Sequence, residues 1–209
     1  SDGSIAAGWD EDGSPIIQME GSQSQHTFWE DGEGGAIVVW YDLRDPYNHN
    51  LYMLRISPDG TLLWGENGTL LCDAVDVQDS GKIAPDGTGN FIVSWRDKRN
   101  DPDGDIYANR IDLDGNVLWQ EDLAVYEGSG IQRNPRVTEA SDGGVFVTWE
   151  DGRNDYQFKD IFVQKISIAG ELYWSVDGEI VSDEINDQCN PRLVGDDNGG
   201  CWIIWDDSR

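Results

Sequence analysis

Short apolar runs, separated by polar turns that contain glycine, follow one another along the whole chain. The most apolar runs, such as residues 36–40 and 201–205, lack the polar alternation of a half-exposed strand. They are typical of strands that are covered on both faces. Asp-Gly and Gly-Gly pairs between the runs favour hairpin turns, which need a positive φ. No window has a sustained helical period, and the 25 glycines oppose helices, so the pattern predicts an all-β fold.

Tryptophan marks a repeating unit within this pattern. One series recurs every 55 residues, and a second lies between its members at spacings of 55, 54 and 56 residues. Each member of the second series opens the phrase Trp-x-Asp-x-Arg. The two series are Trp9, Trp64, Trp119 and Trp174, and Trp40, Trp95, Trp149 and Trp205. A fixed period in this range indicates a solenoid, a propeller or an array. A residue present in every unit is expected to be scaffold, and a residue present in one unit is a better candidate for function.

Each unit contains four strand-like runs. After the Trp-x-Asp-x-Arg phrase come a run such as 105–111, a turn, a short run that ends in tryptophan, a recurring glutamine and the apolar run. Four-stranded sheets that stack face to face around an axis form a β-propeller, and we expect one propeller domain over residues 1–209. Its repeats are predicted at approximately 23–77, 78–131, 132–187, and 188–209 completed in part by 1–22.

The fourth repeat has no counterpart of the third strand. Two arrangements fit this pattern: the termini pair to close a small four-bladed ring with one thin blade, or the chain is a segment of a larger propeller. The sequence slightly favours the segment. Because an unpaired sheet edge invites another chain to add a strand, a protein partner or adjacent subunit is expected at the open sheet edges. A glycan is the other candidate partner.

The charge of the chain limits its partners. Its 41 acidic and 14 basic residues give a net charge of −27, so nucleic acid and anionic membranes are not expected to bind. Most bases occupy recurring positions, and we expect internal ion pairs such as that of Arg44 with an aspartate of its own phrase. The three cysteines, Cys72, Cys189 and Cys201, do not recur and lack metal-finger spacing. At most one disulfide can form among them, and the sequence leaves their redox state open.

A single non-recurring loop carries the candidate metal site. Asp101, Asp103 and Asp105 alternate along it, and alternate aspartates can direct three carboxylates at one hard cation such as calcium. The alternative is a solvated turn in which Asp105 only begins a strand, because the full EF-hand pattern is absent. Calcium is the one cofactor that the sequence suggests. His26 and His49 have no second ligand at metal spacing and are expected to be loop residues.

Several aromatic residues stand outside the periodic series. Trp202 lies in an apolar run and is expected in the core. Trp29 is expected to pack, although an exposed aromatic ring in an acidic rim could stack on a sugar. The tyrosines without counterparts in other units are expected in loops that could recognise a partner; they include Tyr47, Tyr126 and Tyr156.

Two resemblances follow from the motifs. The order Gly-Gly-x-Ile-Val-x-Trp-x-Asp-x-Arg, Asp-Ile-Tyr-x-x-Arg-Ile and Asp-Gly-x-x-Leu-Trp resembles repeats of large secreted or surface proteins of bacteria that are thought to be propellers. This resemblance covers the chain and implies an extracellular, cell-surface or periplasmic location. The segment from Ser57 through Asp59 to Trp64 resembles a degenerate Asp-box of sialidase-type propellers, a motif that is structural in that family.

The sequence therefore favours a non-catalytic extracellular propeller module, not an enzyme, that binds a partner or supports a larger assembly. One alternative is a calcium-assisted glycan-binding propeller. A sialidase-type glycoside hydrolase is the less favoured alternative, because it would need three arginines that converge beside a tyrosine. The recurring arginines are expected to be distributed around a ring instead. Retaining glycosidases need two carboxylates about 5 Å apart, and 41 acids give no way to locate such a pair.

Overall fold

The computed structural model describes residue 5 and residues 7–209, and this part of the chain folds into fourteen β-strands without a helix. The all-β prediction is confirmed. No segment of the described chain forms a long apolar helix of the kind that could span a membrane. The strands are β1 (Gln23–Glu30), β2 (Ala36–Asp42), β3 (Asn50–Ile56), β4 (Thr69–Cys72), β5 (Gln78–Pro85), β6 (Phe91–Asp97), β7 (Asp105–Ile111), β8 (Leu123–Tyr126), β9 (Gln132–Glu139), β10 (Val145–Asp151), β11 (Asp160–Ile166), β12 (Glu179–Ser182), β13 (Gln188–Gly195) and β14 (Cys201–Asp207).

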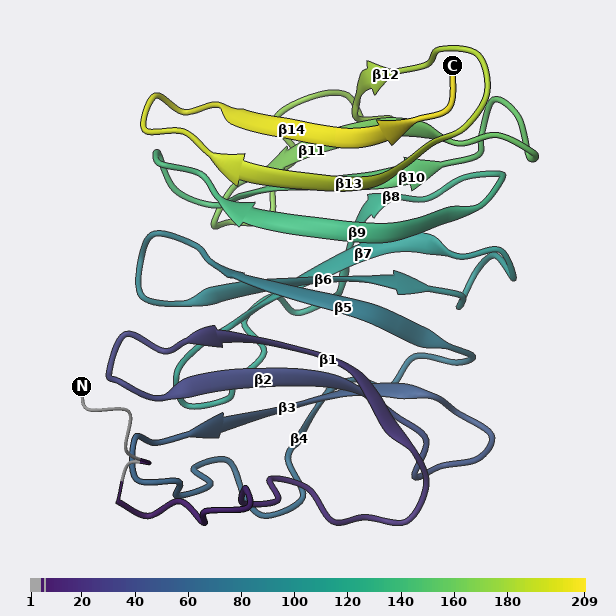
Figure 1. Ribbon diagram of the computed structural model, residues 1–209. Coiled ribbons are helices and arrows are strands. Elements are labelled where there is room, and N and C mark those ends of the chain that lie inside the picture. Colours follow the sequence, from purple (N-terminus) through teal and green to yellow (C-terminus); the bar gives the residue numbers. More distant parts are fainter. Residues whose placement is uncertain (1–4, 6) are drawn as a thin grey trace.

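Twelve of the strands form three antiparallel four-stranded sheets, β1–β4, β5–β8 and β9–β12, each with its strands in chain order. We call these sheets blades 1 to 3. The strands β13 and β14 pair only with each other, and we call them the open blade. The sheets stack face to face, and the first strands β1, β5, β9 and β13 lie next to one another (Figure 1). The open blade lies at the far end of the stack from blade 1 (Figure 1), so the described blades do not close a ring.

The Trp, Asp and Arg side chains of the Trp-x-Asp-x-Arg phrase bond to one another inside each complete blade. The indole Nε1 of Trp40 donates to Asp42 at 2.7 Å, and Arg44 pairs with the same carboxylate at 2.7 Å. Blades 2 and 3 repeat both contacts within 2.5–2.8 Å. The Arg44 guanidinium also lies 3.7 Å from the ring centre of Tyr52 on β3, a cation–π geometry. The predicted pairing of Arg44 within its own phrase is confirmed.

The other tryptophan series joins neighbouring blades. Trp64 of blade 1 donates from Nε1 to the carbonyl of Leu113, in a turn of blade 2, at 3.1 Å. Gly115 of that turn has φ +85°, and a Cβ there would lie 3.0 Å from the Trp64 ring. Glycine is therefore required both by the backbone conformation and by the close approach of the indole. Trp9 and Trp119 make the equivalent bonds, so the indoles of this series recur as contacts between neighbouring parts of the stack.

Apolar clusters fill the spaces between blades. One cluster joins blades 1 and 2, with Val39 and Trp95 as members, and a second joins blades 2 and 3, with Ile92 and Trp149 as members. The side of blade 1 that faces away from blade 2 is covered by Trp9, Ile16 and Ile17 of the segment that precedes β1. That segment runs beside β3 and β4, away from β13 and β14 (Figure 1).

Two aromatic predictions are wrong. Trp202 is 71% exposed instead of buried, because its side of β14 faces away from blade 3. Tyr126 is not in a loop: it ends β8, is buried, and stacks on Trp149 with ring centres 6.2 Å apart. Tyr47 and Tyr156 are exposed, as loop residues should be.

Candidate functional site

The first strand of every blade contains a bulge at the same position. The residue two places after the recurring glutamine has a positive φ of 51–59° in each of the four strands, at Gln25, Ser80, Asn134 and Asn190. The strand register shifts at the same places. A non-glycine residue in this region costs about 1–3 kcal/mol. Bulges of this kind often re-aim side chains next to functional sites.

The residues beside the bulge change identity from blade to blade. One position follows the recurring glutamine, and the other follows the tryptophan of the phrase. Strand pairing sets the two positions opposite each other. We call them the variable pairs: Ser24 with Tyr41, Asp79 with Arg96, Arg133 with Glu150, and Cys189 with Asp206. Because scaffold residues flank them on both sides, the variable pairs are the part of the unit that is free to carry function.

Three carboxylates lie among the variable pairs. Asp79 binds Arg96 through two nitrogens, and the Nε contact measures 2.9 Å. Glu150 is fully buried, and its Oε2 accepts the Arg133 Nε at 2.7 Å. The Oε1 of Glu150 accepts the Asn134 side-chain amide at 2.8 Å. Donors therefore surround Glu150 on both oxygens and stabilise its negative charge.

The carboxylates of blade 3 and the open blade are tied together by one residue. The backbone N–H of Asn190 donates to Glu150 Oε1 at 2.8 Å, and its side-chain amide donates to Asp206 Oδ2 at 2.9 Å. Asp206 is exposed, in contrast to Glu150. Asn190, at the bulge, thus holds a buried and an exposed carboxylate in a fixed relation.

In the variable pair of blade 1, Tyr41 contacts His49, with 2.6 Å between the tyrosine hydroxyl and His49 Nδ1. Burial, followed by the negative charge of Asp79 on the next blade, raises the pKa of Tyr41. The variable pairs of blades 1 and 2 are therefore close enough to interact. His49, predicted as an isolated loop residue, therefore contacts one of the variable pairs.

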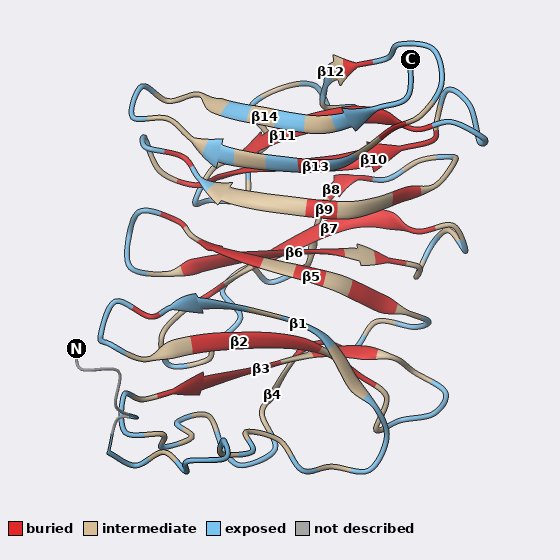
Figure 2. Ribbon diagram, in the orientation of Figure 1, coloured by how far each residue is buried: buried red, intermediate tan, exposed pale blue. Residues whose placement is uncertain are grey.

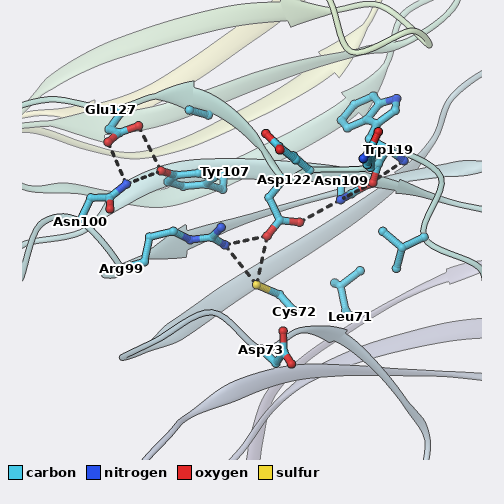
Figure 3. Close-up of a pocket in the computed structure, with 14 residues that line it drawn as sticks. Leu71, Cys72, Asp73, Arg99, Asn100, Tyr107, Asn109, Trp119, Asp122 and Glu127 are labelled. Atoms are coloured by element: carbon cyan, nitrogen blue, oxygen red, sulfur yellow. Dashed lines mark hydrogen bonds and ion pairs between the residues drawn. The ribbon is translucent and has the colours of Figure 1, made fainter.

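A separate cavity of about 590 Å³ lies beside blade 2 (Figure 3). Within it Arg99 binds Asp122 at 2.7 Å and the Cys72 sulfur at 3.2 Å, while the Tyr107 hydroxyl donates to Glu127 at 3.1 Å. Burial, followed by the charge of Asp122, raises the pKa of Cys72, so its thiol stays protonated and unreactive. Arg99 and Tyr107 occupy recurring positions, and the carboxylates of Asp122 and Glu127 accept hydrogen bonds from their neighbours. These contacts are structural.

The calcium candidates Asp101, Asp103 and Asp105 are each engaged differently. Asp101 accepts the backbone N–H of Asp103 at 2.8 Å, and Asp103 accepts the hydroxyl of Tyr156 at 2.9 Å. Asp105 is fully buried, accepts the backbone N–H of Gly128 at 3.0 Å, and leaves its Oδ2 without a partner. Burial raises the pKa of Asp105 to about 6.

Among the residues that the structure describes, no three His, Cys, Asp or Glu side chains form a group that could hold a metal. Calcium binding therefore stays a prediction. The three cysteines are free in the described chain.

The sequence did not locate the variable pairs, although a signal for them was present. In an alignment of the four units, the two columns change while the adjacent glutamine and tryptophan do not. The bulge itself was less visible. Asn134 and Asn190 are compatible with a positive φ, whereas Gln25 and Ser80 give no such indication.

No protein-family model and no curated protein matches this chain. Solved structures do resemble it. The endo-arabinase from Bacteroides thetaiotaomicron matches with TM-score 0.55 and 17% identity, over 88% of this chain and 71% of that structure. A thermostable family-43 glycoside hydrolase matches with TM-score 0.52 and 11% identity, over 85% of this chain and 65% of that one. The α-L-arabinofuranosidase from Lactobacillus brevis matches with TM-score 0.53 and 15% identity, over 76% and 58%.

At these identities the similarity shows the fold: the chain has a β-propeller fold and spans 58–71% of the three structures. The predicted similarity to propeller proteins is confirmed at this coarse level. The expectation of a non-catalytic module that is not an enzyme is corrected, because the three solved structures named above are an endo-arabinase, a family-43 glycoside hydrolase and an α-L-arabinofuranosidase. Fold alone does not assign a reaction, and the argument for one depends on the variable pairs.

Proposed function

We propose that this chain forms part of a glycoside hydrolase and that Glu150 and Asp206 are its pair of catalytic carboxylates. The observation that carries the proposal is the pair of hydrogen bonds from Asn190, which link a buried and an exposed carboxylate through one residue. Most glycoside hydrolases use two carboxylates that flank the scissile bond. The similarity to arabinan-cleaving and arabinofuranoside-cleaving propellers supports the same reaction class.

The two environments suggest a division of roles. Glu150 accepts hydrogen bonds from Arg133, Asn134 and Asn190, and it is suited to stabilise positive charge that develops on the sugar ring. Asp206 is exposed and has one side-chain donor from Asn190. It is the carboxyl group that can exchange a proton with the leaving oxygen or with water.

The proposed setting is outside the cytoplasm: secreted, on the cell surface or in the periplasm. Two observations support it. The chain is strongly acidic, with a net charge of −27, and its repeats resemble those of secreted and surface proteins of bacteria. Extracellular polysaccharides are accessible there. The hydrolase activity of the whole protein is proposed together with this location.

Hydrolysis of 4-nitrophenyl α-L-arabinofuranoside and of arabinan tests the function. Glu150→Gln and Asp206→Asn should each lower kcat/KM by roughly 10²–10⁴-fold with little change in folding. Asp114→Asn, which alters an exposed carboxylate in the turn after β7, is the matched control and should retain activity. A folded wild-type chain that cleaves neither substrate, or a Glu150→Gln variant that cleaves them normally, would reject the proposal.

A further inference from the structure

The cavity of about 590 Å³ is walled by two complete blades. Blade 1 contributes the end of β4 and the residue after it, Leu71, Cys72 and Asp73, and blade 2 contributes the rest of the wall (Figure 3). An apolar cavity of ~150 Å³ is already large enough for benzene, so this space can hold a ring with a substituent. The interface between blades 2 and 3 shows what the repeat places at the same position.

One repeat position accounts for the cavity. Strand pairing sets Cys72 opposite Leu51 and Tyr126 opposite Ile106, so Cys72 and Tyr126 are equivalent. In the interface between blades 2 and 3, the Tyr126 ring covers the guanidinium of Arg153, with 3.5 Å from the guanidinium carbon to the ring centre. Between blades 1 and 2, the thiol of Cys72 stands in place of that ring. The cavity is therefore the space of a ring that this interface lacks.

The guanidinium groups of the two interfaces differ accordingly. Arg153 is covered by a second ring as well, that of Phe162 at 3.8 Å, and two rings at such distances lie on opposite faces. Arg99 is covered by the Tyr107 ring alone, at 4.4 Å, among the residues that the structure describes. Its Nη2 is already bonded to Asp122 at 2.7 Å. The part of Arg99 that remains uncovered is a flat face, which suits an aromatic ring.

A second position changes together with the first. Gly128 lies two residues after Tyr126, and a Cβ there would lie only 2.7 Å from Cζ of the tyrosine ring. The φ of Gly128 is outside the left-handed region, so the ring and not the backbone requires glycine. Blade 1 has Ala74 at this position, two residues after Cys72. Blade 1 thus lacks both the ring and the glycine that makes room for it.

Carboxylates set the charge that the cavity favours. Its wall contains one base, Arg99, and four acids, Asp73, Glu121, Asp122 and Glu127. Asp122 and Glu127 accept hydrogen bonds from their neighbours. Asp73 and Glu121 are exposed, and their side chains bond to no other residue of the described chain. A positively charged group on a ligand would be attracted to these two carboxylates.

We propose that this cavity binds an aromatic amine, with its ring stacked on the Arg99 guanidinium and its ammonium group beside Asp73 and Glu121. The ring takes the place that Tyr126 has in the next interface, and the ammonium group lies at the acidic rim. No member of the variable pairs lines the cavity. The amine site is therefore separate from the proposed catalytic carboxylates and does not depend on hydrolysis.

Tyramine carries both groups and is the probe. A proton–nitrogen NMR titration of the full chain measures its affinity, and the indole Nε1–H of Trp119, which also lines the cavity, reports where it binds. 4-Ethylphenol lacks the ammonium group, and 2-cyclohexylethylamine lacks the aromatic ring. Each of them should bind about threefold or more weakly than tyramine, because each loses one of the two attractions.

Cys72→Tyr/Ala74→Gly introduces the two residues that fill the next interface. This variant should lose roughly tenfold or more of the tyramine affinity, because its own ring fills the space. Ala74→Gly alone should bind tyramine as the wild type does. Asp73→Asn/Glu121→Gln changes only exposed side chains and should weaken tyramine about threefold or more while leaving 4-ethylphenol unchanged. Glu66→Gln, at the position of Glu121 in blade 1 and outside the cavity, is the matched control and should change neither affinity.

Four results would overturn the proposal: no shift of the Trp119 indole with tyramine, equal binding of 2-cyclohexylethylamine, equal binding of 4-ethylphenol, or full tyramine affinity in a folded Cys72→Tyr/Ala74→Gly variant. If that variant does not fold, Asp73→Asn/Glu121→Gln decides, and an unchanged tyramine affinity then rejects the site. Because binding is measured, tyramine binding by a chain that cleaves no glycoside would reject only the proposed function.

Discussion

The complete blades and the open blade place the same repeat positions in opposite environments. Ile92 of blade 2 and Phe146 of blade 3 are 0% and 2% exposed, but the equivalent Trp202 of the open blade is 71% exposed. Ile204 is 69% exposed, although Val39 at the same position of blade 1 is fully buried. In Figure 2 the second strands of blades 1 to 3 are largely buried, whereas β14 is exposed or intermediate along its length.

This difference separates what a repeat encodes from what its neighbour supplies. The sequence of the unit determines the strand, its register and the side to which each residue points. Burial comes from the adjoining blade. An apolar face with no adjoining blade is typical of an interaction site.

The largest expected effect comes from removing the same indole in both environments. Trp95→Ala should lower the free energy of unfolding by about 3–5 kcal/mol, because the ring is fully buried and its Nε1 binds Asp97 at 2.8 Å. Trp205→Ala should cost clearly less, since Trp205 is only half-buried. Urea unfolding of both variants measures the difference. Equal losses would mean that the open blade is as well packed as blade 2.

A second pair of variants tests the exposed face directly. Phe146→Thr should lower the free energy of unfolding by about 2–4 kcal/mol, in the range of large-to-small core changes. Trp202→Thr should change it by about 0.5 kcal/mol or less, as surface substitutions do. A large loss at Trp202 in the isolated chain would show that its ring is covered in solution.

Much of the fold could be predicted from the sequence, because the scaffold residues recur. The period of Trp40 and its counterparts predicted the sheets, and the phrase around Trp40 predicted the pairing of Arg44 with an aspartate. Trp202 was misplaced because an apolar run indicates a buried strand only when both neighbours are present. Burial on the far side of β14 is not a local property of its sequence.

The candidate site was less accessible to prediction. The effect of the Arg136 and Arg192 charges on Lys82 depends on the closeness of the first strands of neighbouring blades, which the period does not contain. The link from Glu150 to Asp206 depends on the bulge at Asn190, whose backbone N–H turns toward the preceding blade. Repetition in the sequence identifies equivalent positions, but only the radial arrangement of strands shows which equivalent positions meet.

Lys82 of blade 2 and Arg192 of the open blade occupy the same repeat position, and the pH dependence of Lys82 is the third test. The pKa of Lys82 is lowered to about 8 in the folded chain, below its ordinary value of 10.5, and Arg136, Asp79 and Arg192 are the charged groups that act on it. The unfolded chain therefore binds more protons between about pH 8 and 10.5, and stability should rise with pH in this window by on the order of 2 kcal/mol. Lys82→Met should remove the rise, as measured by urea unfolding at pH 7, 8, 9 and 10. A rise that persists in the variant would assign it to another group.

Asp105 gives the last test and compares two complete blades. Its counterpart Asp160 in blade 3 accepts the side-chain amide of Asn154 at 2.8 Å, whereas the Oδ2 of Asp105 has no partner. The pKa of Asp105 is raised to about 6 from an ordinary 3.8, so the folded chain binds more protons between these values and loses stability as pH rises from about 4 to 6. Asp105→Asn should flatten this part of the profile by about 1–3 kcal/mol, and Asp160→Asn should flatten it less.

The predicted calcium ion would oppose the same loss by neutralising Asp105. Millimolar calcium should then raise the Tm of the wild type at pH 7 but not that of Asp105→Asn, and an identical Tm in calcium and in chelator would remove the metal from Asp101, Asp103 and Asp105.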